Sequence, residues 1–180
     1  MIFNTNIFPN SNLKEPKPKY LHLGCGNIIH RDKNVEWINV DLYEPEADLK
    51  CDVMKLPFES NTISHIYSSH VVEHVHYHDT FKLLKEWRRV LNVGGTLEIE
   101  TPDLLKSCEA FVKGNENERI NLYPHFFGMG WLPGGAHLFL FTRKQLEWTL
   151  EQVGFKDIEF LPALRYIQKE HICLKVRCIK

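Results

Sequence analysis

The sequence predicts an α/β fold built on one largely parallel β-sheet. Short apolar segments rich in β-branched and aromatic residues alternate with longer segments whose apolar residues recur at helical spacing, and this alternation is typical of βαβ units. The chain of 180 residues, 43% hydrophobic and 25% charged, is long enough for one domain with its own core. We therefore expect an N-terminal arm over residues 1–18 and a single domain over residues 19–180.

Seven segments have the composition of β-strands. In chain order they are 19–25 (KYLHLGC), 36–42 (EWINVDL), 47–53 (ADLKCDV), 63–69 (ISHIYSS), 96–102 (TLEIETP), 155–161 (FKDIEFL) and 171–179 (HICLKVRCI). The last segment alternates strictly between apolar and polar residues, and a direct turn before it would make an antiparallel pair. The predicted sheet is therefore mostly parallel with an antiparallel edge strand.

Three further segments have the spacing and the ends of helices. They are 79–91, 103–114 and 142–154. Asp79 or Thr80 is the expected N-cap of the first helix, because both side chains can accept from free backbone N–H groups. Thr142 and Gln145 have the spacing of a capping box at the start of the third.

Composition and charge exclude several classes of function. The net charge is −1 and the basic residues form no long run, so nucleic acid is not expected as the main partner. The five cysteines are Cys25, Cys51, Cys108, Cys173 and Cys178. Their number is odd and none is spaced as Cys-x-x-Cys, which argues against a disulfide framework. Cysteines of this kind are expected to be reduced, mostly buried thiols, and together with the absence of a long apolar segment they predict a cytoplasmic protein without a membrane partner. The protein is expected to be a monomer or a homodimer.

Two glycines and an acid point to a nucleoside site. Gly24 and Gly26 come where the first strand ends, and Asp41 closes the second strand. Glycines let a ligand lie against the main chain, and a carboxylate at that place can accept both hydroxyls of a ribose. A dinucleotide fingerprint would have a third glycine opening a helix, but Ile29 stands there. Since residues 27–40 must also contain a strand, we expect the first crossover helix to be shortened or absent.

Several motifs in order resemble those of the class I S-adenosylmethionine-dependent methyltransferases, especially the small ones. They are "LHLGCGN", "INVDL", "CDVMKLPFESNTISHIYSSHVVEHV", "EWRRVLNVGGTLEIETPD" and "HLFLFTRKQLEWTLEQVGF". The resemblance runs from about Tyr20 to Phe155. It implies a Rossmann-like sheet, a transferase activity, S-adenosylmethionine as cofactor and S-adenosylhomocysteine as product.

The resemblance also implies a set of cofactor contacts. They are Leu23, Gly24, Cys25, Gly26, Asp41, Leu42, Asp52, Val53, Ser68, Ser69 and His70. The glycine turn would pass under the methionine part, and Asp41 would hold the ribose hydroxyls. Leu42, Asp52 and Val53 would lie around the adenine. Ser68, Ser69 and His70 would face the transferable methyl group.

The stretch "SHVVEHVHYH" allows more than one interpretation. His70, Glu73 and His74 have the spacing of a reversed zinc-peptidase motif, for which His125 or His137 would supply a third ligand. In the resembled family, however, Glu-His-Val is commonplace at this position, so no metal is expected and a structural role at a helix start is favoured. His76 and His78 are expected to face solvent.

The acceptor side is expected at an insertion over residues 115–140. The aromatic and glycine-rich stretch from Asn121 to Phe141 has the composition of a lid over a flat or sugar-like acceptor, although such aromatics also serve ordinary packing. His70 and His137 are the candidate catalytic bases, since imidazole accepts protons near neutral pH.

Together these features predict an enzyme that methylates O or N of a small molecule, with a sugar or glycan precursor considered first. The alternatives are an RNA or protein methyltransferase, and a regulatory protein that binds the cofactor without turnover.

Overall fold

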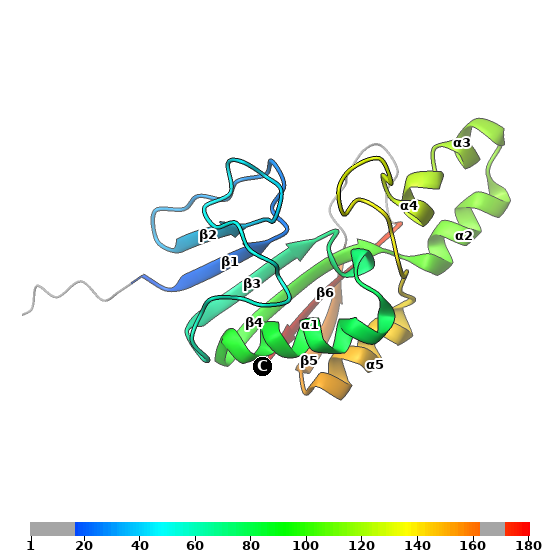
Figure 1. Ribbon diagram of the computed structural model, residues 1–180. Coiled ribbons are helices and arrows are strands. Elements are labelled where there is room, and N and C mark those ends of the chain that lie inside the picture. The colour runs from blue at the N-terminus through cyan, green and yellow to red at the C-terminus, as the bar shows by residue number, and fades with distance from the viewer. Residues whose placement is uncertain (1–16, 163–171) are drawn as a thin grey trace, which may run out of the picture.

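The structure, a computed structural model, describes residues 17–162 and 172–180. Its centre is a six-stranded sheet in the order β2-β1-β3-β4-β6-β5 (Figure 1). The strands are β1 (Lys19–Leu23), β2 (Glu36–Val40), β3 (Ile63–Ser69), β4 (Leu91–Pro102), β5 (Lys156–Leu161) and β6 (Cys173–Ile179). The helices are η1 (Val72–His74), α1 (Tyr77–Val90), α2 (Leu104–Lys113), α3 (Glu116–Ile120), α4 (Tyr123–Phe127) and α5 (Arg143–Val153). The predicted N-terminal arm lies almost wholly outside the described residues, as does most of the connection from β5 to β6.

The strand directions confirm the predicted fold class. The pairs β1–β2, β1–β3 and β3–β4 are parallel, whereas β6 is antiparallel to both β4 and β5. The antiparallel pair therefore lies at one edge of a mostly parallel sheet. Because β1, β2 and β3 are parallel and adjacent, their carboxyl ends meet at the same edge, where a ligand can bind.

The first two crossovers contain no helix. Residues 24–35 and 41–62 form turns and extended chain, as expected for the first of them. The predicted strand over residues 47–53 is wrong, because only an isolated bridge from Val40 to Leu49 remains of it. The reason is local competition for hydrogen bonds: the Asp48 carboxylate accepts from the backbone and side chain of Asn39 and from Arg31.

Helices α1 and α5 lie side by side over one face of the sheet (Figure 1). The residues that α1 buries recur at helical spacing and are Thr80, Leu83, Leu84, Trp87 and Val90. Their apolar members join the sheet residues in one core cluster. Burial of this stripe stabilises the helix in the absence of strong caps.

The helix boundaries agree with two of the three predictions. α5 begins with the predicted capping box of Thr142 and Gln145, and α2 ends at Gly114. The predicted N-cap of α1 is wrong, because the helix starts earlier, at Tyr77. Thr80 is buried inside the first turn, and the carboxylate of Asp79 pairs with Lys82 instead.

The opposite face of β1, β2 and β3 carries a cluster of rings. Tyr20 lies edge-on to Trp37, and His22 stacks on His30 with ring centroids 4.2 Å apart. Tyr67 completes the cluster beside both histidines. Contacts between rings therefore order the strands on the face that does not carry α1 and α5.

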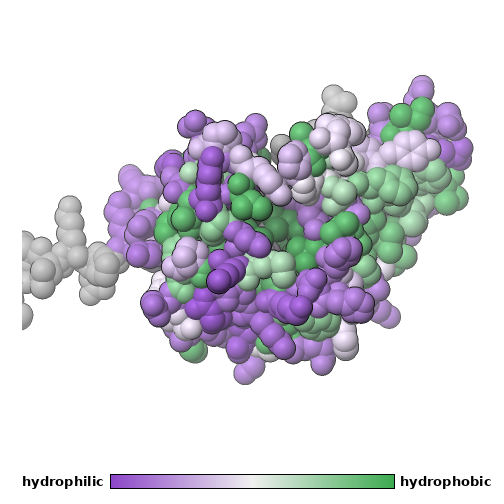
Figure 2. Space-filling model, viewed as in Figure 1, coloured by the Kyte–Doolittle hydropathy of each residue, from purple (hydrophilic) through white to green (hydrophobic). Residues whose placement is uncertain are grey.

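The predicted insertion contains two short helices that the sequence did not reveal. α3 and α4 follow α2, and Figure 1 shows all three projecting from the carboxyl end of β4. Apolar side chains reach the surface over this part (Figure 2), among them Val112, Tyr123 and Phe127. None of the helices among the described residues is long and apolar enough to cross a bilayer.

Candidate active site

The glycine turn after β1 approaches the start of η1 closely. Gly24 and Gly26 both have positive φ, +67° and +47°. A Cβ atom on Gly24 would collide with a methyl group of Val71, whereas one on Gly26 would meet no atom within 4 Å. Backbone N–H groups of Gly24 and Cys25 donate to the carbonyl of Val40, at 2.8 and 3.1 Å. The backbone of the turn is therefore closely packed at Gly24, whereas free space lies next to Gly26, where a ligand could lie against the main chain.

Asp41 fastens this turn to the loop after β2. One carboxylate oxygen accepts from the N–H of Gly26 at 2.9 Å, and the other accepts from Tyr43 and Glu44 at 2.8 and 3.0 Å. Burial opposes ionisation, but these backbone donors outweigh it and lower the pKa of Asp41. A carboxylate offers about four acceptor positions, so roughly one remains for a ribose hydroxyl without a rearrangement.

The other residues predicted around the adenine lie in the segment that joins β2 to β3. Leu42 is half exposed beyond Asp41. Asp52 is exposed and accepts from the N–H of Met54 at 2.8 Å, and the Val53 carbonyl accepts from the indole N–H of Trp87 at 3.0 Å. These bonds order the loop and leave the second oxygen of Asp52 available.

Leu23 and Cys25 lie inside this edge of the sheet. Leu23 is fully buried, and Cys25 is 2% exposed. Burial, with the negative charge of Asp41 nearby, raises the pKa of the Cys25 thiol to about 11. Cys25 is therefore a neutral packing residue under the turn and not a nucleophile.

The end of β3 presents an unsatisfied hydroxyl and a strained histidine. Ser68 is buried, and its hydroxyl has no hydrogen-bond partner among the described residues. Ser69 lies at the last position of the strand, in register with Glu100. His70 follows with a φ of +55°, and its N–H donates to the Glu100 carbonyl at 2.8 Å. Such a backbone conformation in a residue other than glycine persists only where its surroundings hold it.

His70 is held by a buried carboxylate. Its Nδ1 atom lies 2.9 Å from one oxygen of Glu73, and the other oxygen accepts from the Thr101 hydroxyl at 2.9 Å. The Glu73 side chain is fully buried. Burial would raise the pKa of Glu73, but the bond and charge of His70 hold it below its ordinary value.

The Glu73 carboxylate also favours the protonated form of His70. Burial lowers the pKa of His70, but hydrogen bonds with Cys173 and Glu73, together with the negative charge of Glu73, raise it to about 10. The residues around His70 come from three elements. Glu73 belongs to η1, Thr101 to the end of β4, and Cys173 to the start of β6, which pairs with that end of β4. Sequence spacing revealed neither Thr101 as a partner of Glu73 nor Cys173 as a partner of His70, because these contacts depend on how β4 and β6 pair in the sheet.

His74 and His137 face one another beside Glu73. Their ring centroids lie 4.9 Å apart in an edge-on arrangement. Nδ1 of His74 is 2.9 Å from the carbonyl oxygen of Ala136, and Nδ1 of His137 is 3.1 Å from that of His125. Burial lowers the pKa of His137. His70 and His137, the two predicted bases, are therefore joined into one cluster through Glu73 and His74.

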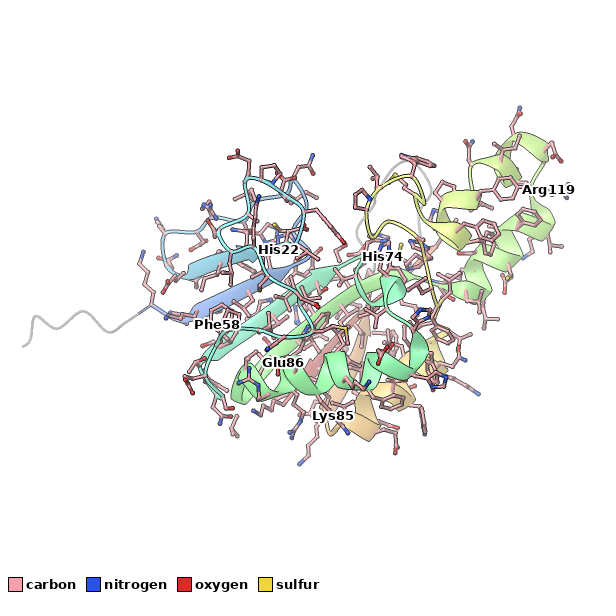
Figure 3. The ribbon with its side chains drawn as sticks, viewed as in Figure 1. His22, Phe58, His74, Lys85, Glu86 and Arg119 are labelled. Carbon is pink, nitrogen blue, oxygen red and sulfur yellow. The ribbon has the colours of Figure 1, made fainter. Side chains whose placement is uncertain are left out.

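A loop over residues 128–138 closes above this cluster. A cavity of about 220 Å³ lies between the loop and η1, lined by His74, Gly130, Leu132, Gly134, Gly135, Ala136 and Leu138. Figure 3 shows His74 below the loop, and a Cβ atom on Gly134 would lie 3.0 Å from the ring of Tyr43. The loop thus spans from η1 to the segment after β2. Trp131, which belongs to the stretch predicted to form a lid, is 77% exposed.

Comparisons with known proteins agree with this architecture. A family model described as a methyltransferase domain matches residues 6–159, and no curated protein matches. The fold is similar to that of an S-adenosylmethionine-dependent methyltransferase from Archaeoglobus fulgidus, with a TM-score of 0.65, 16% identity, and 91% of this chain and 86% of that chain covered.

Two further solved structures share the fold. One is the 1,6-didemethyltoxoflavin-N1-methyltransferase of Burkholderia thailandensis, solved with 1,6-didemethyltoxoflavin and S-adenosylhomocysteine (TM-score 0.62, 16% identity, 91% of this chain and 72% of that chain). The other is a phosphoethanolamine N-methyltransferase of Haemonchus contortus, of which this chain spans half the length (TM-score 0.58, 16% identity, 94% of this chain). At such identities the likeness is one of fold. The match to the family model covers most of the chain, and the protein therefore belongs to the methyltransferase domain family, as the resemblance of its motifs predicted.

Proposed function

We propose that the protein transfers a methyl group from S-adenosylmethionine to an oxygen or nitrogen atom of a small molecule. The observation that carries this proposal is the convergence of Gly26, Asp41 and Ser68 at the carboxyl ends of three adjacent parallel strands. Beyond them a cavity opens beside His74. Ligands of open α/β sheets bind at this edge.

The described residues fit the methyl donor. Open space over Gly26 leaves room for its methionine part, and the unsatisfied hydroxyl of Ser68 offers a polar contact. The remaining acceptor position of Asp41 suits one ribose hydroxyl. To bind the second ribose hydroxyl as well, the Asp41 oxygen that accepts from the N–H of Gly26 must give up that hydrogen bond. Leu42 and Asp52 would lie against the adenine. No helix N-terminus follows the glycine turn, so the site suits a nucleoside without phosphates.

S-adenosylmethionine supplies an electrophilic methyl group, so the protein mainly aligns the acceptor and excludes water. We assign alignment to His70, whose ring Glu73 holds in place. His137 is a better proton acceptor than His70. Its Nδ1–H donates to the carbonyl of His125, which leaves a lone pair on Nε2. The loop over residues 128–138 excludes water from the acceptor.

The cavity favours a small acceptor without strong negative charge. Among the described residues that line it there is neither lysine nor arginine, although RNA recognition relies on such side chains. Two exposed rings lie next to residues that line the cavity, Tyr43 beside Gly134 and Trp131 between Gly130 and Leu132 in the chain, and such rings suit a flat or sugar-like acceptor. A sugar or glycan precursor remains the acceptor that we propose first.

Binding of the donor is tested by replacing two comparable glycines. Gly26 and Gly94 both have positive φ, and at each a Cβ atom would meet nothing within 4 Å, so alanine imposes a similar backbone cost at both. Gly26→Ala should abolish the thermal stabilisation by S-adenosylhomocysteine. Gly94→Ala should keep it, because Gly94 lies near the start of β4, away from the carboxyl ends of the strands. NAD should stabilise neither protein. A larger stabilisation by NAD, or equal binding by both variants, would contradict the proposal. Transfer of labelled methyl groups to fractionated small molecules would then identify the acceptor.

A further inference from the structure

We propose that Glu73, His74 and His137 bind a divalent transition-metal ion beside the cavity under the loop. One ligand atom from each residue lies within 4.8 Å of the others. Two imidazoles and one carboxylate are a ligand set that Zn²⁺ and related divalent ions use in proteins. Metal binding by these residues stands independently of the methyl-donor site.

Hydrogen bonds fix both histidines in the tautomer that binds metal. A carbonyl oxygen only accepts hydrogen bonds, so Nδ1 of His74 beside Ala136 and Nδ1 of His137 beside His125 must each carry hydrogen. The lone pair of each neutral ring is then on Nε2. Backbone carbonyls orient metal-binding histidines in this way in known metal sites.

The carboxylate is equally well oriented. Glu73 is fully buried, and it is held by the hydroxyl of Thr101 and by Nδ1 of His70. Each carboxylate oxygen has two lone pairs, so these bonds leave room for a metal bond. Thr101 and His70 would therefore be the residues that orient the anionic ligand.

The third ligand depends on the loop, which is fastened to the same place. Backbone N–H groups of Leu138 and Phe139 donate to the carbonyl of Glu73, at 2.7 and 3.2 Å. These bonds hold His137 next to η1, although more than sixty residues separate the two in the sequence. The reversed motif, from which no metal was expected, groups His70 with His74 and leaves the third ligand to His125 or His137. In the structure His70 faces Glu73, and His137 is the histidine that lies beside His74.

The site has room for an exogenous ligand. Three protein ligands leave a coordination position open in a tetrahedral site, and the cavity of about 220 Å³ adjoins His74. Under the proposed function, a metal-bound hydroxyl or amine of the acceptor would occupy that position. Nε2 of His137 would then be a ligand and not a proton acceptor, so the two roles exclude one another.

Metal titration of the tag-free protein tests the site. After chelation and removal of the chelator, Co²⁺ should bind in a 1:1 ratio with visible absorption bands, and Zn²⁺ should displace it. His74→Asn and His137→Asn each retain a side-chain N–H near the position of Nδ1 but lack Nε2. Each should weaken binding by more than the roughly 10- to 100-fold that the loss of a ligand's hydrogen-bond partner costs. The matched control is His78→Asn, an exposed histidine of the same segment, which should bind as the wild type does.

Equal Co²⁺ affinity in the wild type, His74→Asn and His137→Asn would overturn the metal site, and so would no binding by the wild type. Should the variants unfold, X-ray absorption of the Zn²⁺-loaded wild type decides, since two imidazoles and a carboxylate are expected and any other set contradicts the proposal. Stabilisation by S-adenosylhomocysteine is measured on the same samples. Donor binding without metal binding refutes the metal site alone, and metal binding without donor binding refutes the proposed function alone.

Discussion

The carboxylate of Asp41 accepts a hydrogen bond from the backbone N–H of Gly26, 2.9 Å away. The bond joins the ends of β1 and β2 directly, without the crossover helix that usually lies between such strands. The second oxygen of Asp41 accepts from two N–H groups of its own loop. One side chain therefore orders both loops of the proposed donor site.

Asp41→Asn should lower both stability and donor affinity. The amide has a single acceptor oxygen and places an NH₂ group against backbone N–H donors, so at least one of them loses its partner. We expect a loss of about 1–3 kcal/mol in the free energy of unfolding, measured by urea denaturation. Glu44→Gln is the control, because its carboxylate accepts one exposed N–H from Glu46. Equal losses in the two variants would show that Asp41 does not fasten the loops.

His22 should make stability depend on pH in a defined window. Its side chain is 2% exposed, and burial, with the nearby charge of His30, lowers its pKa from 6.5 to about 4. Asn39 and Asp41 act in the opposite direction, and Tyr67 lies beside the ring. Above pH 6.5 neither the folded nor the unfolded state protonates the ring. Between pH 6.5 and 4 only the unfolded state binds the proton, so stability falls as the pH falls, by up to about 1.4 kcal/mol per pH unit.

The variant His22→Phe isolates this contribution. Phenylalanine keeps a ring against His30 and Tyr67 but does not titrate. The difference in unfolding free energy between wild type and variant should therefore change between pH 7 and pH 4. His78→Phe controls for the loss of an exposed histidine. A pH profile that His22→Phe leaves parallel to that of the wild type would exclude His22 as its source.

Thr101→Val tests the buried bond to Glu73. The substitution keeps the β-branched shape and removes the hydroxyl that donates to the carboxylate at 2.9 Å. Because the buried Glu73 carboxylate then loses one of its hydrogen-bond donors, we expect a loss of about 1–3 kcal/mol in the free energy of unfolding. Thr62→Val, which removes an exposed hydroxyl bonded to the Glu59 carbonyl, should cost clearly less. Chemical denaturation of both variants makes the comparison.

Local signals predicted the sheet and most helix ends. The apolar segments, the capping box at Thr142 and the glycine stops act within a few residues, so their consequences can be read from the sequence. The segment 47–53 looked like a strand because of its composition. It failed to become one because Asp48 bonds to Asn39 and Arg31, partners that only the folded chain brings near. The short helices of the insertion lack the apolar periodicity that would reveal them.

The candidate site was predicted in its parts but not in its connections. Glycine spacing and family motifs predicted the loops of the proposed donor site. The pairing of Glu73 with Thr101, the approach of Cys173 to His70, and the contact of His137 with His74 all depend on strand register and on the return of the loop. No periodicity encodes such distant contacts. The reversed-motif spacing, from which no metal was expected, groups His70 with His74, whereas the structure turns the His70 ring towards Glu73 and places His137 against His74.

Substitutions of Gly128 and Gly130 test whether the conformation of the loop over residues 128–138 determines the position of His137. Gly128 has a φ of +67° and a ψ of −158°, a combination that is essentially restricted to glycine. A Cβ atom there would collide with the carbonyl of Gly135 and lie 2.7 Å from the His137 ring, whereas one on Gly130 would meet nothing within 4 Å. Gly128→Ala should therefore displace His137.

The expected result is faster hydrogen exchange at the amides of Met129 and His137, which bond across the loop to Gly135 and Phe127 at 2.7 and 3.1 Å. Gly130→Ala should leave both amides protected. Because Gly26 and Asp41 lie outside the loop, S-adenosylhomocysteine should stabilise both variants. Co²⁺ binding should fall in Gly128→Ala and not in Gly130→Ala, and methyl transfer should fall in Gly128→Ala. Unchanged exchange in Gly128→Ala would mean that the loop does not depend on this backbone conformation. Faster exchange with undiminished methyl transfer would mean that His137 takes no part in the reaction.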